Sequence, residues 1–237
     1  ISVDTIKSGY QILVIDEADD LEIEIAAIPM AELDETAYVL FTSGSTGKPK
    51  GVVISYLGVI NTIKAINQRF KINQDDAILA LSELSFDLSV YDMFGMLGAG
   101  GKVIFPDPDK VKEPSHWYEL IEKYQITIWN TVPQIMQLLI DYVISQKKQL
   151  DSLRVVLLSG DWIPLNLPKQ IKSLNPNITV MSLGGATEGS IWSCWYEINE
   201  IDETWKSIPY GIAMPNQKMY VLDSQGRHCP TNVIGEI

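Results

Sequence analysis

The segment from Thr42 to Gly51 combines glycines, hydroxyls and lysines in a pattern that suits phosphate binding. It reads Thr42-Ser43-Gly44-Ser45-Thr46-Gly47-Lys48-Pro49-Lys50-Gly51. The glycines permit backbone angles that other residues avoid, so successive N–H groups can converge on an anion. The hydroxyls and the lysines Lys48 and Lys50 supply further donors and positive charge. A flexible, solvated Ser/Gly turn is the simpler alternative. A Walker A loop is excluded, because no Gly-Lys-Ser/Thr run opens a helix.

The elements that must position this segment alternate between short β-branched runs and longer helical patterns. The predicted strands are Gln11–Asp16, Tyr38–Thr42, Gly51–Ser55, Ala77–Leu81, Lys102–Phe105, Ile126–Asn130, Arg154–Leu158 and Ile178–Ser182. The predicted helices are Tyr56–Phe70, Leu88–Leu97, Ser115–Tyr124, Pro133–Tyr142 and Leu167–Leu174. This alternation implies βαβ units around a mostly parallel sheet, and therefore a layered α/β/α fold.

The last part of the chain has a different pattern. Lys218–Asp223, the turn Ser224-Gln225-Gly226 and Asn232–Ile237 read as a strand, a turn and another strand. We therefore expect residues 1–206 to form the α/β part and residues 207–237 to begin a smaller β-rich subdomain. The sequence opens on a strand pattern and stops within one, which predicts a fragment of a longer protein.

The composition is that of a globular protein with a sizeable core. Hydrophobic residues make up 46% of the 237 residues, and no apolar run reaches the ~18 residues that a membrane span needs. The net charge of −12 argues against nucleic acid as the partner and requires a local positive feature for any anionic ligand. Two cysteines cannot form a disulfide framework and the N-terminus lacks signal-peptide features, so a cytoplasmic location is expected.

Four motifs, in order along the chain, resemble those of the adenylate-forming superfamily of acyl-CoA synthetases, luciferases and nonribosomal peptide synthetase adenylation domains. The first is the phosphate-binding signature at Thr42–Gly51. The others are Phe86-Asp87-Leu88-Ser89, Gly185-Ala186-Thr187-Glu188 and Gly235-Glu236-Ile237. The resemblance covers essentially the whole chain. It implies the large N-terminal core of an adenylation domain, without the C-terminal lid domain.

The resemblance implies that a substrate carboxylate attacks the α-phosphate of ATP, which gives an aminoacyl adenylate and pyrophosphate. Catalysis then comes from positioning and charge stabilisation rather than from a covalent nucleophile. The glycine-rich signature is expected to hold the leaving phosphates, Thr187 to contact a phosphate oxygen, and Glu188 to help bind Mg²⁺. A simple turn is the alternative for Thr187 and Glu188. The remaining nucleotide contacts are expected at Gly160, Asp161, Gly184, Gly185 and Ala186.

Asp87 has two interpretations. It is a good N-cap for the predicted helix Leu88–Leu97, and the resemblance adds that its carboxylate meets the α-ammonium of an amino acid. The peptide-synthetase pocket positions fall on Asp87, Leu88, Tyr91, Asn130, Leu157, Ser159, Leu183, Ile191 and Trp192. This set resembles that of cysteine-activating domains paired with heterocyclisation domains. A small, mostly dry cavity with Ser159 or Asn130 as polar partner suits a thiol, although each residue alone reads as ordinary core.

Two departures from the family's pattern bear on the nucleotide. Many relatives carry an aromatic residue that stacks on adenine where this chain has Gly184, so adenine is expected to rest on backbone and on neighbours such as Gly160 and Asp161. The ribose-binding aspartate and the lysine of the C-terminal domain fall beyond Ile237 in the family's order. We therefore expect this chain alone to bind nucleotide weakly and to catalyse poorly.

The partners that the resemblance implies are L-cysteine, a peptidyl carrier protein with its phosphopantetheine, and condensation or heterocyclisation domains of the same assembly line. An acyl- or aryl-CoA ligase is one alternative, which Asp87 disfavours because a carboxylate suits an amino-acid substrate. A non-catalytic, truncated adenylation fold that binds a nucleotide or another protein is the second alternative.

Overall fold

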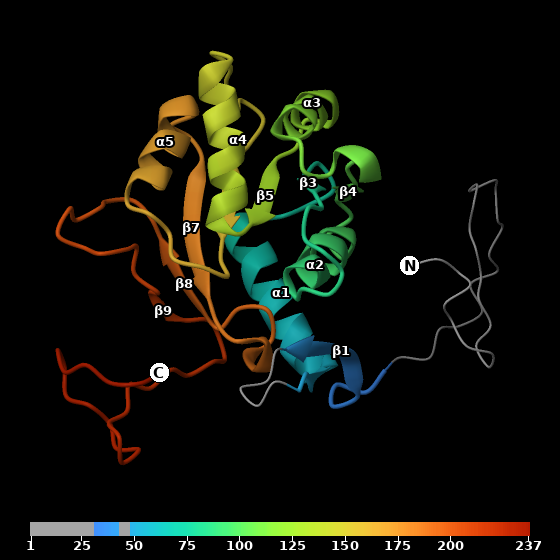
Figure 1. Ribbon diagram of the computed structural model, residues 1–237. Coiled ribbons are helices and arrows are strands. Elements are labelled where there is room, and N and C mark those ends of the chain that lie inside the picture. Colours follow the sequence, from blue (N-terminus) through green and yellow to red (C-terminus); the bar gives the residue numbers. More distant parts are fainter. Residues whose placement is uncertain (1–30, 43–47) are drawn as a thin grey trace. The chain divides into compact units, whose positions relative to one another are not determined.

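The computed structural model describes residues 31–42 and 48–237, so the predicted strand Gln11–Asp16 and the segment Ser43–Gly47 lie outside the described residues. Seven of the described strands form one sheet in the order β4-β3-β5-β6-β7-β8-β9 (Figure 1). A two-stranded antiparallel hairpin is built from β1 (Thr36–Thr42) and β2 (Lys50–Ser55). The hairpin therefore carries the phosphate-binding signature between its strands.

The centre of the large sheet is parallel, as the sequence predicts. The parallel strands are β3 (Ala77–Leu79), β4 (Lys102–Ile104), β5 (Ile128–Thr131), β6 (Val155–Leu158) and β7 (Thr179–Gly184). Two antiparallel strands, β8 (Cys194–Glu197) and β9 (Ile212–Ala213), extend the sheet beyond β7. Sequence periodicity does not predict β8 and β9, because each is too short to show an alternating pattern.

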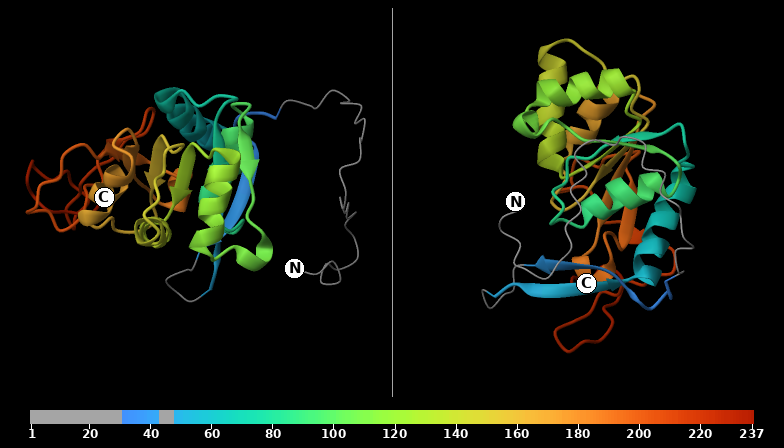
Figure 2. Two further views of the ribbon diagram at one scale, coloured as in Figure 1. Left: turned by 90° about the horizontal axis from the view of Figure 1, so that it is seen from above. Right: turned by 90° about the vertical axis from the view of Figure 1, so that its right-hand side faces the viewer.

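Helices cover both faces of this sheet, which gives the predicted three layers (Figure 2). The helices on one face are α3 (Pro114–Tyr124), α4 (Pro133–Ser145) and α5 (Asn166–Leu174). The elements on the other face are α1 (Tyr56–Phe70), α2 (Leu88–Val90) and the π-helical turn η2 (Tyr91–Gly95). Short 3-10 turns lie at η3 (Pro108–Lys110) and η4 (Thr187–Gly189).

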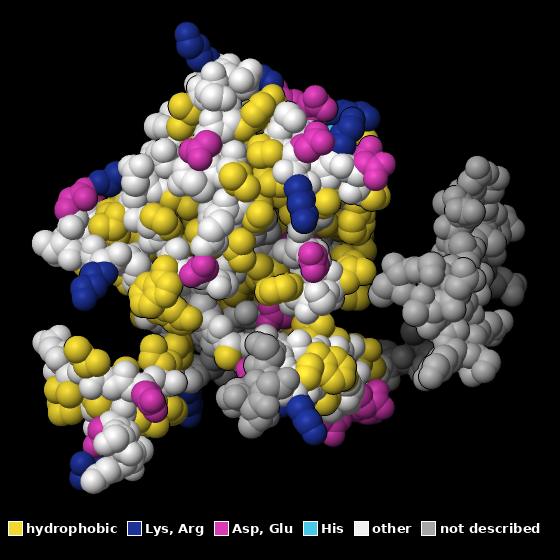
Figure 3. All heavy atoms as spheres, viewed as in Figure 1, with side chains coloured by type: hydrophobic (Ala, Val, Ile, Leu, Met, Phe, Trp, Pro, Cys, Tyr) yellow, Lys and Arg dark blue, Asp and Glu magenta, His cyan; other side chains and the backbone are white. Residues whose placement is uncertain are grey.

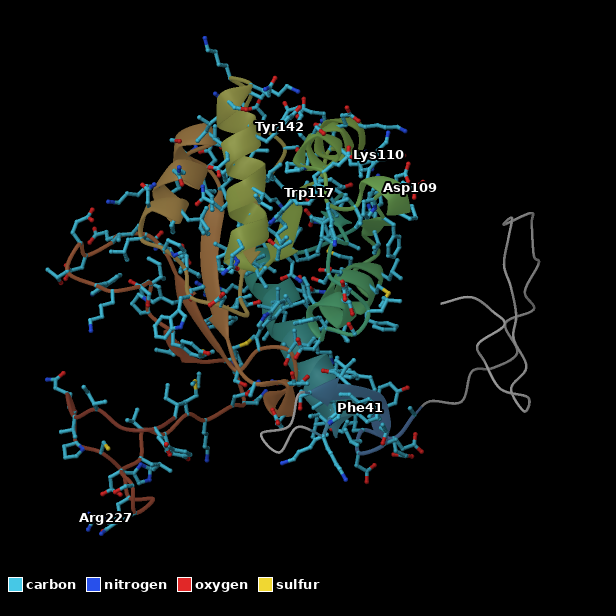
Figure 4. All side chains as sticks on the ribbon, viewed as in Figure 1. Phe41, Asp109, Lys110, Trp117, Tyr142 and Arg227 are labelled. Carbon is cyan, nitrogen blue, oxygen red and sulfur yellow. The ribbon has the colours of Figure 1, made fainter. Side chains whose placement is uncertain are left out.

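Side-chain alternation along the strands separates two hydrophobic cores. On β6, Val156 and Leu158 belong to the core under α3, α4 and α5, whereas Val155 and Leu157 belong to the core under α1 and α2. This alternation follows from the pleat of a strand, in which successive side chains point to opposite faces. Trp117 of α3 lies in the first core (Figure 4). The candidate pocket positions Leu157, Leu183 and Trp192 lie in the second.

The predicted helix Leu88–Leu97 forms, but it is not a regular α-helix. The α-helical part covers only Leu88–Val90 before the backbone widens into the π-helical turn η2. Asn67 of α1 fixes this turn, because its Nδ2 donates to the Gly95 carbonyl at 2.8 Å and its Oδ1 accepts from the Tyr91 hydroxyl at 3.0 Å. π-helical turns are frequent at functional sites.

The predicted strands Lys218–Asp223 and Asn232–Ile237 do not form as strands, so this prediction is wrong. Leu222 makes only isolated bridges, with His228 and with Glu236. Most residues of this segment are exposed, and a short hairpin with no buried face is marginal in water. The subdomain boundary at residue 207 stays a prediction.

The described surface combines exposed hydrophobic side chains with charged groups of both signs (Figure 3). Acidic and basic side chains are interspersed over the face shown in Figure 3. Among the residues that the structure describes, no helix has the length and apolar character needed to cross a bilayer.

Candidate active site

A cavity of about 380 Å³ lies beside the carboxyl ends of β6 and β7. Parallel strands end at one edge of a sheet, which is where ligands bind in open α/β folds. The loops that follow these two strands contribute Ser159, Gly160, Gly184 and Gly185 to the wall. The segment Phe86–Leu88 closes the opposite side. The cavity thus brings together motifs that lie about one hundred residues apart in the sequence.

The phosphate-binding hairpin lies against the same region. Thr42 at the end of β1 pairs with Lys50 at the start of β2, so the two ends of the signature are held side by side. Strand β2 contacts η4, the turn that carries Thr187 and Glu188. Lys48 and Lys50 are exposed, while Ser43, Gly44, Ser45, Thr46 and Gly47 lie outside the described residues.

Asp87 is a half-buried carboxylate in the cavity wall. Burial raises its pKa above the ordinary aspartate value, and a hydrogen bond from the Thr187 hydroxyl acts in the opposite direction. Its backbone is already helical and its side chain makes no capping hydrogen bond, so the structure does not support the N-cap interpretation. The carboxylate is therefore placed where a cationic ligand group can use it.

The wall around Asp87 is mostly apolar. The predicted pocket residues that line the cavity are Asp87, Leu88, Ser159, Leu183, Ile191 and Trp192. The indole Nε1 of Trp192 donates to the Ser159 hydroxyl oxygen at 3.0 Å, which leaves the hydroxyl hydrogen of Ser159 available to another acceptor. Apolar side chains with one oriented hydroxyl suit a small ligand of low polarity.

The other predicted pocket residues, Tyr91, Asn130 and Leu157, are fully buried and lie outside the cavity lining. The Tyr91 ring packs on Trp192 with centroids 5.1 Å apart. Asn130 Nδ2 donates to Asp92 Oδ1 at 2.7 Å, whereas Asn130 Oδ1 and Asp92 Oδ2 have no hydrogen-bond partner. Burial raises the pKa of Asp92 to about 7, although the Asn130 hydrogen bond lowers it in part. These three residues support the lining from behind.

The backbone is strained beside the cavity. Ser190 and Ile191 have φ values of 66° and 50°, in the left-handed region that β-branched residues avoid. The Thr62 hydroxyl donates to the Ser190 carbonyl at 3.2 Å and helps to hold this turn. Such strain persists only where the surroundings enforce it, and it is concentrated at functional sites. Here it directs Ile191 and Trp192 into the cavity wall.

The residues predicted to contact nucleotide fall into two groups. Gly160, Asp161, Gly184, Gly185 and Thr187 line the cavity, whereas Ala186 and Glu188 do not. Glu188 is exposed on η4. No cluster of three or more potential metal-ligating side chains is found within the described ranges. One carboxylate is nevertheless compatible with Mg²⁺, which binds through one or two carboxylates and the phosphates of the substrate.

Sequence reasoning missed part of the lining. Tyr210, Ile208 and Val132 also face the cavity. Tyr210 and Ile208 follow β8 in a segment with no periodic pattern, so no local signal marks them. The sequence offers one indirect signal for Tyr210. This chain has Gly184 at the position where many relatives carry an aromatic residue.

Together, the fold and the site define a three-layer α/β protein with a cavity at the carboxyl edge of a parallel sheet, flanked by the hairpin that carries the predicted phosphate-binding signature. The sequence matches the AMP-binding enzyme family over residues 4–237, so the chain belongs to that family. It is an AMP-binding domain of the kind found in nonribosomal peptide synthetases.

Curated relatives and solved structures agree with this assignment. The chain is 50% identical to pyochelin synthetase PchF of Pseudomonas aeruginosa over 88% of this chain and 12% of the relative. It is 50% identical to bacitracin synthase 1 of Bacillus licheniformis over 87% of this chain and 4% of that protein. The AMPPNP-bound nonribosomal peptide synthetase FmoA3 superposes with a TM-score of 0.82 at 40% identity, over 90% of this chain and 23% of that one. The chain thus spans a small part of each relative's length.

Proposed function

We propose that this chain is the substrate-binding core of an adenylation domain that activates an amino acid, L-cysteine, for a nonribosomal peptide synthetase. The observation that carries the proposal is the position of Asp87. Its carboxylate lies half-buried in the wall of a small cavity that Thr187 also lines, and the turn that carries Thr187 contacts the hairpin with the phosphate-binding signature. An ammonium-binding group and a phosphate-binding group therefore adjoin one cavity.

The proposed reaction needs only positioning by the protein. A carboxylate oxygen of the amino acid attacks the α-phosphorus of ATP, the bond from that phosphorus to the bridging oxygen breaks, and pyrophosphate leaves with the electron pair. Asp87 holds the ammonium group, while Lys48, Lys50 and the signature residues between the strands stabilise the leaving phosphates. Thr187 contacts a phosphate oxygen. Glu188 is the residue that would hold Mg²⁺, which neutralises phosphate charge when bound.

The lining of the cavity supports a small, weakly polar side chain. Leu88, Leu183 and Ile191 supply apolar contacts, and the Ser159 hydroxyl hydrogen can be donated to a thiol sulfur because Trp192 already uses a lone pair of the oxygen. Large side chains are excluded by volume. The pocket disfavours serine only modestly. Apolar pockets of this kind distinguish side chains of nearly the same shape by only ~1–3 kcal/mol of binding free energy.

The proposal extends to the partners of the reaction. The adenylate would be transferred to the phosphopantetheine thiol of a peptidyl carrier protein and then used by condensation or heterocyclisation domains, in the cytoplasm. The similarity to long synthetases, of which this chain spans a small part, supports such an arrangement.

The test is amino-acid-dependent ATP–pyrophosphate exchange with the protein that carries this chain. We expect L-cysteine to give the strongest exchange and L-serine a weaker one. A stronger response to leucine would contradict the cysteine assignment. A stronger response to benzoate or a fatty acid would instead identify an acyl- or aryl-CoA ligase, and no exchange with any acid would indicate a non-catalytic module.

A further inference from the structure

We propose that Tyr210 provides the aromatic ring on which the adenine of ATP stacks, in place of a side chain at position 184. The proposal rests on the ATP-dependent function proposed above. It assigns a nucleobase contact to a residue that no sequence motif marks.

The first argument is the space beside Gly184. A Cβ atom placed on Gly184 would lie 2.5 Å from Cε1 and 2.8 Å from Cδ1 of Tyr210. The tyrosine ring therefore occupies the volume into which a side chain at this position would project. An aromatic side chain at position 184 and the Tyr210 ring in this position exclude each other. The glycine that departs from the family's pattern is thus explained by a ring that arrives from another segment.

The second argument is that the segment around Tyr210 is anchored on both sides. Before it, the N–H of Ile208 donates to the carbonyl of Ile163, in the loop after β6, at 3.2 Å. After it, Gly211 has a φ of 93° and its Cα packs against the carbonyl of Trp195, where no Cβ fits. Strand β9 then pairs with β8, and Cys194 of β8 lies between Gly184 and Ala213 in register. The sheet itself therefore brings Tyr210 to the end of β7.

The third argument is the exposure of the ring. Tyr210 lines the same cavity as Gly160, Asp161 and Gly185, yet 51% of its surface is open. A ring backed by a glycine and open on another side is a surface on which a planar base can stack. The ring needs no specific partner atoms, because every base has a π-face. The indicated ligand class is a purine nucleotide with its phosphates toward the hairpin.

The experiment compares Tyr210→Ala and Tyr210→Phe in ATP–pyrophosphate exchange, with the protein that carries this chain and L-cysteine as the substrate. We expect Tyr210→Ala to raise the KM for ATP between about 5-fold and 100-fold and to leave the KM for cysteine unchanged. Tyr210→Phe keeps the ring and should keep the wild-type KM for ATP. In the double variant Gly184→Tyr with Tyr210→Ala, the aromatic ring projects from position 184 instead of position 210. The KM for ATP of this variant should return toward the wild-type value.

The outcomes separate this inference from the function on which it rests. If the wild-type protein shows exchange and Tyr210→Ala leaves the KM for ATP unchanged, the stacking role of Tyr210 is overturned and the proposed function is not. Equal increases in the KM for ATP in the Ala and Phe variants would also overturn it. Absence of exchange in the wild-type protein with every amino acid would overturn the proposed function itself.

Discussion

The Asp87 side chain carries an energetic cost that the hydrogen bond from Thr187 offsets only in part, because the net shift of its pKa is upward. Burial raises its pKa, so the folded protein binds a proton at this carboxylate more tightly than the unfolded chain does. At neutral pH the ionised form therefore destabilises the fold. No capping hydrogen bond compensates for this cost within the helix. A residue that opposes folding in this way is best explained by binding.

We predict that Asp87→Asn lowers kcat/KM for the amino acid by about 30-fold or more, because a partly desolvated charge pair loses about 2–5 kcal/mol when one partner is removed. The melting temperature should stay the same or rise, because the variant removes an ionised group from a half-buried place. Exchange kinetics and thermal unfolding provide the two measurements.

Asp107 offers a matched control for this prediction. Its Oδ1 accepts from the N–H of Asp109 at 3.0 Å, so it caps the 3-10 turn η3, and it does not line the cavity. Asp107→Ala should cost about 1 kcal/mol of stability and leave exchange unchanged. If Asp87→Ala destabilised the protein like Asp107→Ala, the N-cap interpretation of Asp87 would be preferred, because alanine removes the capping oxygen in both variants.

At the scale of elements, the pair Asp92–Asn130 joins the turn η2 to strand β5. Asn130 Nδ2 donates to Asp92 Oδ1 at 2.7 Å and also reaches the Leu88 carbonyl at 3.4 Å. Leu88 follows Asp87 directly, so this contact positions the start of α2, next to the carboxylate that we propose binds the ammonium group. The pair has no access to solvent, because both side chains are fully buried.

The pH dependence of the free energy of unfolding should reveal the ionisation of Asp92 in this pair. Burial raises the pKa of Asp92 from the ordinary aspartate value of 3.8 to about 7, so the folded state binds more protons than the unfolded state between these pH values. Stability from this group is therefore lost as the pH rises through that window, and the loss is complete above it. The melting temperature of Asp92→Asn minus that of the wild type should grow from about pH 5 to about pH 8.

Asp76 provides a control, because its pKa is shifted in the opposite direction to that of Asp92. Burial acts to raise its pKa, but the Arg154 guanidinium, at 2.6 Å, and the Thr127 hydroxyl lower it below the ordinary value. Asp76 therefore stabilises the fold above the unfolded pKa, and this stability is lost as the pH falls. Asp76→Asn should destabilise the protein most at neutral pH. A pH-independent effect of Asp92→Asn would contradict the assignment of the raised pKa.

Elements with strong local signals were predictable from the sequence. Helix α1 forms over the predicted residues, because its apolar stripe is complete and Ser55 caps it by accepting from the Gly58 N–H at 3.4 Å. The π-helical turn was not predictable, since it depends on Asn67 in another element. Strands β8 and β9 depend on pairing with β7 rather than on their own pattern. Motifs located much of the site, whereas Tyr210 reaches it through the sheet topology alone.

At the scale of the whole described unit, the hydrophobic cores on the two faces of the sheet contribute differently to the lining of the cavity. The core under α3, α4 and α5 reaches the cavity through Ile163 and Ile208, whereas its members Trp117, Trp129 and Leu158 do not line the cavity. The core under α1 and α2 contains Leu88, Leu183 and Trp192, which do line it. Packing changes in the second core therefore reach the cavity, whereas changes at Leu158 and other members of the first core that do not line the cavity affect mainly the free energy of unfolding.

Leu157 and Leu158 test this separation with one residue type on one strand. Both are fully buried in β6 and point to opposite faces, so Leu157→Ala and Leu158→Ala should each destabilise the protein by about 2–5 kcal/mol. Only Leu157→Ala opens space in the core that contains Tyr91 and Trp192, so only this variant should shift exchange toward larger amino acids such as methionine or leucine. Urea unfolding measures the first effect and exchange with a set of amino acids the second. An equal shift in selectivity in Leu158→Ala would show that the cavity responds to loss of stability in general, because that side chain belongs to the core on the other side of the sheet.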